Sequence, residues 1–130
     1  MRAPDFLNID LDIESTSPLD SLAQEFGDQV IVTFSGRMNG RHCLYMESAD
    51  AGRSQDAVLN ALCSLVEGLS ESGRRLWDAA DKREFDLGYE TRLSFERANR
   101  FKIRPGTLRR VTGLGATVAV TIYPEDIRTK

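Results

Sequence analysis

The segment SQDAVLNALCSLVEGLSESGRRLWDAADKREFDLGYE, residues 54–90, contains the clearest helical and strand patterns of the chain. In its first half apolar residues recur at helical spacing, and Ser54 stands where a side chain caps a first turn. A shorter helical pattern over 74–81 carries the only tryptophan, Trp77, and residues 84–90 alternate between acidic and apolar. We therefore predict a long amphipathic helix that ends near residues 70–73, a short helix with Trp77 in the core, and a strand with one buried face.

On the N-terminal side of this segment, the sequence predicts a strand, a short helix and a hairpin. Ser17 is placed to cap a helix that begins at Pro18 and ends at Gly27. An alternating strand follows, and Asn39-Gly40 is a strong signal for a tight turn into a returning strand. The first strand, residues 7–14, has an acidic outer face and a predicted inner face made of Leu7, Ile9, Leu11 and Ile13.

On the C-terminal side, residues 100–104 alternate basic and apolar side chains and predict a strand with a basic outer face. A short helix after the break at Pro105-Gly106, a final strand over 117–123 and a tail over 124–130 complete the chain. The predicted core cluster contains Leu62, Leu65, Trp77, Phe85, Val120 and Ile122.

An internal similarity relates residues 1–36 to residues 99–123. Both read as strand, short helix, strand, and Gly27 and Gly115 occupy matching positions between helix and final strand. A helix that must stop within two or three residues favours a residue that tolerates positive φ. The similarity indicates either a duplication or a structural pseudo-repeat.

The order of predicted elements places residues 1–130 in a single α+β domain. We expect a mainly antiparallel sheet with helices on one face, a ferredoxin-like split βαβ core, and a further strand-helix-strand unit. Two smaller sheets related by the repeat are the alternative.

Several features of the chain can be compared with known proteins: Leu44-Tyr45-Met46-Glu47, the long helix, Trp77, and Leu114-Gly115-Ala116 before the strand at 118–123. In these features the chain resembles small bacterial domains of unknown function, some of which are encoded as immunity proteins beside toxins. The resemblance implies no active site to carry over.

Composition excludes several classes of protein. The chain has ordinary globular contents of hydrophobic (41%) and charged (28%) residues, so a disordered or fibrous protein is excluded. We expect a cytoplasmic protein, because no apolar run is long enough for a membrane span and the N-terminus lacks a signal-peptide pattern. Cys43 and Cys63 are then expected to be reduced and buried. One histidine and two distant cysteines predict no metal site, and no motif predicts a cofactor.

Charge is unevenly distributed along the chain, although the net charge is only −3. Acidic side chains dominate the outer faces of the strands at 7–14 and 84–90, so we expect cross-strand ion pairs with the basic strand at 100–104. The overall acidity argues against a nucleic-acid partner. The candidate interaction surface is the basic group Arg100, Lys102, Arg104, Arg109 and Arg110.

The absence of any catalytic constellation in the sequence, together with the segregated charges, favours a non-enzymatic protein-interaction module, with an immunity-type inhibitor as its specific form. The partner is a protein of unknown identity, and a homodimer is left open. A small-ligand-binding or accessory domain is the alternative, and an unrecognised enzyme comes third.

Overall fold

The alternating segments of the sequence form one five-stranded sheet. The computed structural model describes residues 5–50, 52–90 and 100–124. Its strands are β1 (Asp5–Ser15), β2 (Val30–Met38), β3 (Arg41–Ser48), β4 (Lys82–Glu90) and β5 (Thr117–Tyr123). In the order β2-β3-β1-β4-β5, neighbours are antiparallel except β4 and β5, which are parallel. The predicted α+β class with a mainly antiparallel sheet is confirmed.

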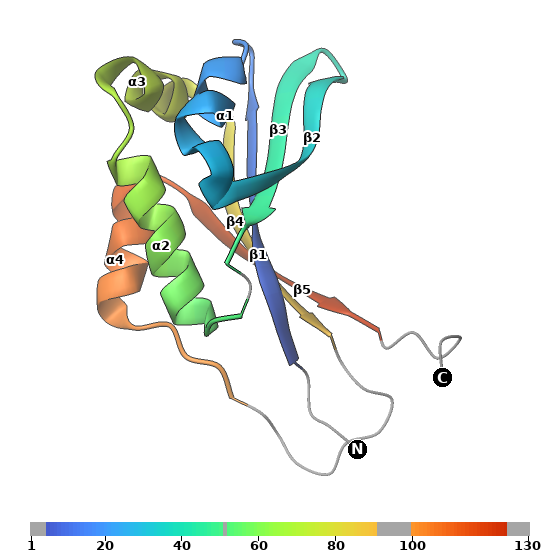
Figure 1. Cartoon of the computed structure of the whole chain (residues 1–130), viewed down its shortest axis with the longest axis vertical. Helices are drawn as coiled ribbons and strands as arrows, with labels where there is room; N and C mark the ends of the chain where they lie inside the picture. Colours follow the sequence, from blue (N-terminus) through green and yellow to red (C-terminus); the bar gives the residue numbers. More distant parts are fainter. Residues whose placement is uncertain (1–4, 51, 91–99, 125–130) are drawn as a thin grey trace.

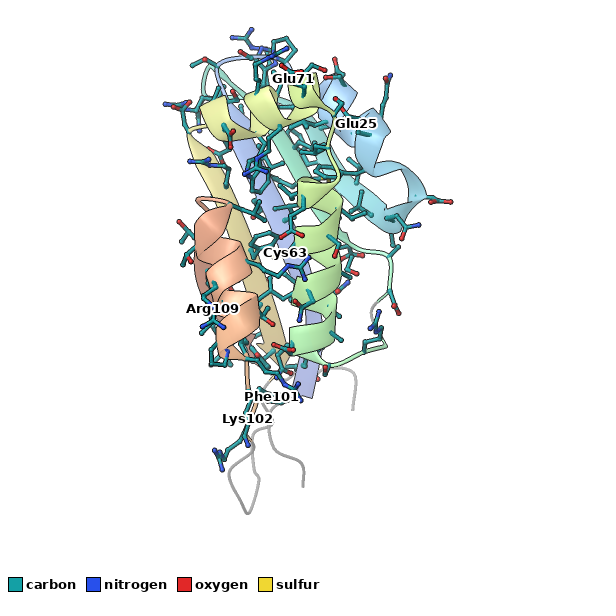
Figure 2. The ribbon with its side chains drawn as sticks, turned by 90° about the vertical axis from the view of Figure 1, so that its left-hand side faces the viewer. Glu25, Cys63, Glu71, Phe101, Lys102 and Arg109 are labelled. Atoms are coloured by element: carbon teal, nitrogen blue, oxygen red, sulfur yellow. The ribbon has the colours of Figure 1, made fainter. Side chains whose placement is uncertain are left out.

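Within the described part of the chain, the helices lie on one side of this sheet (Figure 1). They are α1 (Asp20–Phe26), α2 (Gln55–Glu67), α3 (Glu71–Ala79) and α4 (Pro105–Gly113), with a 3₁₀ turn, η1 (Gly27–Gln29), after α1. Figure 2 shows α4 in front of β4 and beside α2, while α1 and α3 cover the other end of the sheet. The opposite face of the sheet carries none of these helices.

The apolar stripe of α2 supplies the centre of the core. Ser54 caps the helix as predicted, and its side chain accepts a hydrogen bond of 3.3 Å from the backbone N–H of Ala57. The helix ends at Gly68, and Ser70 then caps α3 by accepting from the N–H of Gly73. Residues 70–73, predicted as the exit from the long helix, therefore begin the next helix. The buried residues of α2 are Gln55, Val58, Leu59, Leu62, Cys63 and Val66.

Trp77 lies in the core, as the sequence predicts, and is fully buried. Its indole Nε1–H donates a hydrogen bond of 2.9 Å to the carbonyl oxygen of Leu114. Its ring also lies 6.3 Å from that of Phe85, centroid to centroid. Trp77 thus joins α3 to β4 and to the turn between α4 and β5.

Three predicted turns have the expected backbone conformation. Asn39 and Gly40 join β2 to β3, and both have positive φ, 54° and 79°. Gly27 and Gly115, the matching glycines of the internal similarity, have φ of 60° and 71° at the passage from a helix to an edge strand. A side chain with a Cβ would be strained at these glycines.

The first strand and first helix differ from the prediction in detail. The register of β1 against β4 shifts between Phe6 and Asn8, so Phe6 packs against the core and Leu7 is exposed. Helix α1 begins at Asp20 and Ser17 does not cap it. Instead the buried Ser15 hydroxyl accepts from the N–H of Ser17, which holds the chain in a turn before the helix can begin.

Residues 100–104 do not form the predicted strand. The backbone hydrogen bonds of this segment go to side chains at the start of α2. Gln55 Nε2 donates to the carbonyl of Lys102 at 2.8 Å, and Asp56 Oδ1 accepts from the N–H of Arg104 at 2.9 Å. The second copy of the internal similarity therefore lacks its first strand in the described residues. The prediction that residues 100–104 form ion pairs with the acidic strands as a neighbouring strand of the sheet is wrong.

Three members of the predicted core cluster are not fully buried. Leu65 is only partly buried, whereas Val120 and Ile122 are 59% and 60% exposed. These two residues face the helix side of the sheet, but β5 is an edge strand and the helix layer does not reach over it. Leu62, Trp77 and Phe85 are buried in one cluster as predicted. Of the predicted tail, only Pro124 belongs to the described residues.

Candidate functional site

The open face, the side of the sheet that carries none of the described helices, has a group of carboxylates at its centre. Strand alternation sends the apolar residues of β1, β3 and β4 to the helix side and leaves their other side chains on the open face. All six carboxylates are half-buried. This group, the acidic face, consists of Asp10, Asp12, Glu14, Glu47, Glu84 and Asp86.

The register of the central strands places carboxylates directly opposite one another. Asp10 on β1 lies between Glu47 of β3 and Asp86 of β4. One pair further along the strands, Asp12 lies opposite Glu84. Like charges in directly opposed positions destabilise a sheet. The opposed carboxylates of the acidic face therefore lower the free energy of unfolding.

The electrostatics of Asp10 and Asp12 reflect this arrangement. Burial, together with the charge of Asp10, raises the pKa of Asp12 from 3.8 to about 6, although Lys82 acts in the opposite direction. Burial also raises the pKa of Asp10, and the charges of Glu47 and Asp86 add to the effect. Both carboxyl groups are thus held in surroundings that disfavour their ionised form.

Other carboxylates of the acidic face are compensated locally. The Tyr45 hydroxyl donates to Glu14 at 2.6 Å, which raises the pKa of Tyr45. Lys82 Nζ lies 3.7 Å from both Glu14 and Glu84. The Thr121 hydroxyl lies 2.8 and 2.9 Å from the two carboxylate oxygens of Asp86. By contrast, no side chain among the described residues donates a hydrogen bond to the carboxylates of Asp10, Asp12 or Glu47. These three carboxylates remain available to an external cation.

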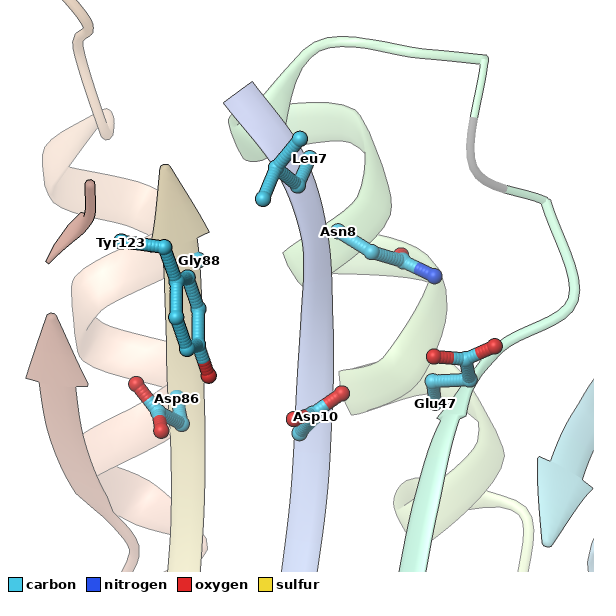
Figure 3. A pocket seen from close by; sticks show the side chains of 7 residues that line it. All are labelled: Leu7, Asn8, Asp10, Glu47, Asp86, Gly88 and Tyr123. Atoms are coloured by element: carbon cyan, nitrogen blue, oxygen red, sulfur yellow. The ribbon is translucent and has the colours of Figure 1, made fainter. Parts of the chain in front are cut away.

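A shallow hollow of about 170 Å³ opens beside Asp10. Figure 3 shows the ring of Tyr123 over Gly88, with its hydroxyl directed toward Asp86 and Asp10. Burial and these nearby carboxylates raise the pKa of Tyr123. Pockets for small ligands usually measure about 300–1,000 Å³, so this hollow fits a single cationic side-chain head better than a metabolite. It is lined by Leu7, Asn8, Asp10, Glu47, Asp86, Gly88 and Tyr123.

An apolar strip borders the acidic face on β2. Ile31 lies opposite Glu47, and Phe34 lies opposite Tyr45 with their ring centroids 5.7 Å apart. Met38 continues the strip at the hairpin, and all three β2 side chains are exposed. The open face therefore combines central negative charge with an apolar border.

The basic residues predicted as an interaction surface are separated by the structure. Arg110 is engaged within the fold, because its guanidinium donates to Glu67 at 2.6 and 3.0 Å, to Asn60 at 2.7 Å and to Ser64 at 2.8 Å. Lys102 and Arg109 are exposed at the lower end of the molecule (Figure 2). Arg100 and Arg104 are exposed in the same region. The predicted interaction surface therefore loses Arg110. Its other four residues remain a predicted basic surface at the lower end of the molecule, on the side of the sheet opposite the acidic face.

Residues considered for covalent or metal chemistry lie apart. Cys43 and Cys63 are both buried and free, as predicted, and burial raises the pKa of Cys63 to about 11. No group of three or more histidine, cysteine, aspartate or glutamate side chains in the described ranges has metal-binding geometry. Among the helices described, none has the length and apolar character needed to span a membrane.

Sequence reasoning identified the acidic strand faces but assigned them the wrong neighbour. The available signal was that acidic residues occupy outward strand positions in three separate stretches, around residues 10–14, 47 and 84–86. Only the strand order β3-β1-β4 shows that these stretches meet one another. Comparisons with protein-family models, with curated proteins and with solved structures gave no match for this chain.

Proposed function

We propose that this protein is a non-enzymatic interaction module whose acidic face binds a basic surface of another protein. The observation that carries the proposal is the position of Asp10, which lies between two further carboxylates on the open face. A fold that retains opposed like charges loses stability, and such losses concentrate at functional sites. A cationic partner would remove that cost when it binds.

The shape of the face indicates how such a partner would bind. A lysine or arginine head fits the hollow at Asp10, Asp86 and Tyr123, while apolar groups of the partner would cover Ile31 and Phe34. Concentrated negative charge would also accelerate the encounter with a basic partner, and this acceleration would weaken as salt is added. The expected partner surface is therefore cationic at its centre and apolar at one side.

An immunity-type inhibitor is the specific form of this function that we propose. The resemblance to small bacterial domains, some of them encoded beside toxins, supports it, as does a face suited to neutralising a basic protein. We place the protein in the cytoplasm, where two buried free thiols such as Cys43 and Cys63 persist. A small-ligand function is less well supported, because the hollow is smaller than typical ligand pockets.

We also propose that the fold is a ferredoxin-like split βαβ core with an added α4–β5 unit. The strand order β2-β3-β1-β4, in which all neighbours are antiparallel, supports this proposal. The positive φ angles shared by Gly27 and Gly115 support a pseudo-repeat limited to helix, turn and edge strand.

The binding proposal is tested with the purified chain as bait and two matched variants. The first is Asp10→Asn/Asp12→Asn/Asp86→Asn, in which asparagine keeps an acceptor for Thr121. The second is Lys102→Ser/Arg109→Ser, which removes two charges from the predicted basic surface and is called the basic-region variant. Basic proteins captured from the source cells are purified, and their affinity for the three baits is measured at low and high salt.

We expect a partner to bind the acidic-face variant at least about tenfold more weakly, a loss of about 1.4 kcal/mol, and to bind the basic-region variant normally. Added salt should weaken the wild-type complex. An immunity-type partner should in addition lose its own activity in the equimolar complex. Equal binding by the acidic-face variant, or loss of binding only in the basic-region variant, would contradict the proposal and favour the basic surface.

A further inference from the structure

In the part of the chain that the structure describes, the strand β5 is an edge of the sheet. Within the described residues it pairs only with β4, in a register without interruption. Its sequence, TVAVTIY, contains no charged residue, glycine or proline. Edge strands usually carry a charge, a proline or a bulge that prevents further pairing. The other edge, β2, has these features, because its register shifts near Thr33 and it carries Arg37.

The exposed side chains of β5 form an apolar stripe on the helix side of the sheet. Val118, Val120 and Ile122 lie in register with the buried residues of β4, but they are 37%, 59% and 60% exposed. Leu108 of α4 is also exposed, and helix geometry turns it about 200° from Arg110, which faces α2. Apolar side chains thus border an open strand edge on the side away from α2.

We propose that β5 pairs antiparallel with β5 of a second copy of this chain. The two-fold axis would stand perpendicular to the sheet at Val120, so that Val118 of each copy faces Ile122 of the partner subunit. This arrangement keeps both helix layers on one side and joins the apolar stripes of the two copies. The stripe is apolar and uncharged on both sides of Val120, so it is complementary to itself under this symmetry.

Distances within such a pair allow it to form. The two copies of β4 would be separated by three strand spacings, about 14 Å. This exceeds the screening length of about 8 Å at physiological salt, so the acidic faces of the two copies would repel each other only weakly. The two α4 helices would lie on the same side of the joined sheet. The apolar stripes and Leu108 would occupy the space between them.

The proposal is tested by sedimentation of the full chain from micromolar to millimolar concentration. The wild type should show a concentration-dependent dimer. Val120→Lys, which brings two like charges together on the axis, should weaken the dimer at least about tenfold. Val32→Lys, at an exposed position of the other edge strand and on the same side of the sheet as Val120, is the matched control and should leave the dimer unchanged. Tryptophan fluorescence of the buried Trp77 checks that each variant is folded.

A charge-pairing experiment tests the register. Val118→Glu and Ile122→Lys should each weaken self-association, whereas an equimolar mixture of the two should associate more tightly than either variant alone. In the mixture the introduced glutamate of one copy meets the introduced lysine of the other across one half of the interface. The wild-type apolar pair is kept in the other half.

Three results would overturn the proposal: a wild type that is monomeric at millimolar concentration, a Val120→Lys variant that dimerises normally, or a mixture no tighter than its components. An apolar strand pair depends little on salt, whereas the proposed basic partner dissociates as salt rises, so the two proposals succeed or fail separately. An extended peptide that pairs with the β5 edge of a monomeric chain would identify a different occupant and would also reject the dimer.

Discussion

The carboxyl group of Asp12 makes the stability of the fold depend on pH. Its pKa is raised to about 6 in the folded protein, so the folded state binds this proton more tightly than the unfolded state does. The ionised form therefore destabilises the fold, and this cost is absent below about pH 4, grows toward about pH 6 and is complete above it.

Asp12→Asn should consequently raise the free energy of unfolding at about pH 7, by about 1–2 kcal/mol after allowance for solvent screening. The gain should vanish near pH 4, where the wild-type carboxyl group is largely protonated. Urea unfolding at several pH values measures it. Glu14→Gln is the control and should not stabilise, because Glu14 has Tyr45 and Lys82 as partners. An Asp12→Asn variant less stable than wild type at neutral pH would show that repulsion is not the dominant effect.

Trp77 provides a second prediction for a single residue. Trp77→Phe leaves the buried carbonyl of Leu114 without its indole donor and also removes core volume. We expect a loss of about 2–4 kcal/mol in unfolding free energy. Ile31→Ala, at an exposed strand position, should change stability by no more than about 0.5 kcal/mol. A loss for Trp77→Phe as small as that of the control would mean that the hydrogen bond contributes little.

At the scale of secondary-structure elements, Arg110 attaches α4 to α2. Its guanidinium is hydrogen-bonded to three α2 side chains, and the charge of Glu67 is stabilised in return, since hydrogen bonding to Arg110 lowers the pKa of Glu67. The attachment matters because α4 leads directly into β5, whose position depends on the helix before it.

Arg110→Met should therefore destabilise the protein by about 1 kcal/mol, because the half-buried Asn60 and the exposed Ser64 and Glu67 lose their donor. Hydrogen exchange should show faster opening of α4 and β5 than of β1 and β3. Arg109→Met is the matched control, since Arg109 is exposed on the same helix and should have little effect. Uniform acceleration of exchange across all five strands would argue against a local attachment.

At the scale of the whole molecule, the acidic face should make the fold more stable as salt is added. The net charge is only −3, so a general repulsion is small, but six carboxylates share one sheet face. Screening of that local repulsion should raise the melting temperature between low salt and about 1 M sodium chloride. The Asp10→Asn/Asp12→Asn/Asp86→Asn variant should show a smaller rise. If the two proteins respond equally, the salt effect does not come from the acidic face.

The sequence by itself determined the elements whose signals are local. The apolar stripe of α2, the cap at Ser54, the alternation in β4 and the Asn39-Gly40 turn depend on nearest neighbours along the chain. Trp77 could also be assigned to the core, because a large aromatic ring on an apolar helix side is rarely left exposed. Local patterns likewise separated the acidic outer side chains of the strands from their buried ones.

Only the tertiary structure decided which strands are neighbours. Asp10 faces Glu47 and Asp86 because β1 lies between β3 and β4, an order that no local pattern specifies. Residues 100–104 alternate like a strand, yet Gln55 and Asp56 take their backbone hydrogen bonds. Val120 and Ile122 alternate like core residues but are exposed, since burial requires a covering layer and the helices end before β5. Alternation identifies the two sides of a strand, whereas long-range packing determines what, if anything, covers each side.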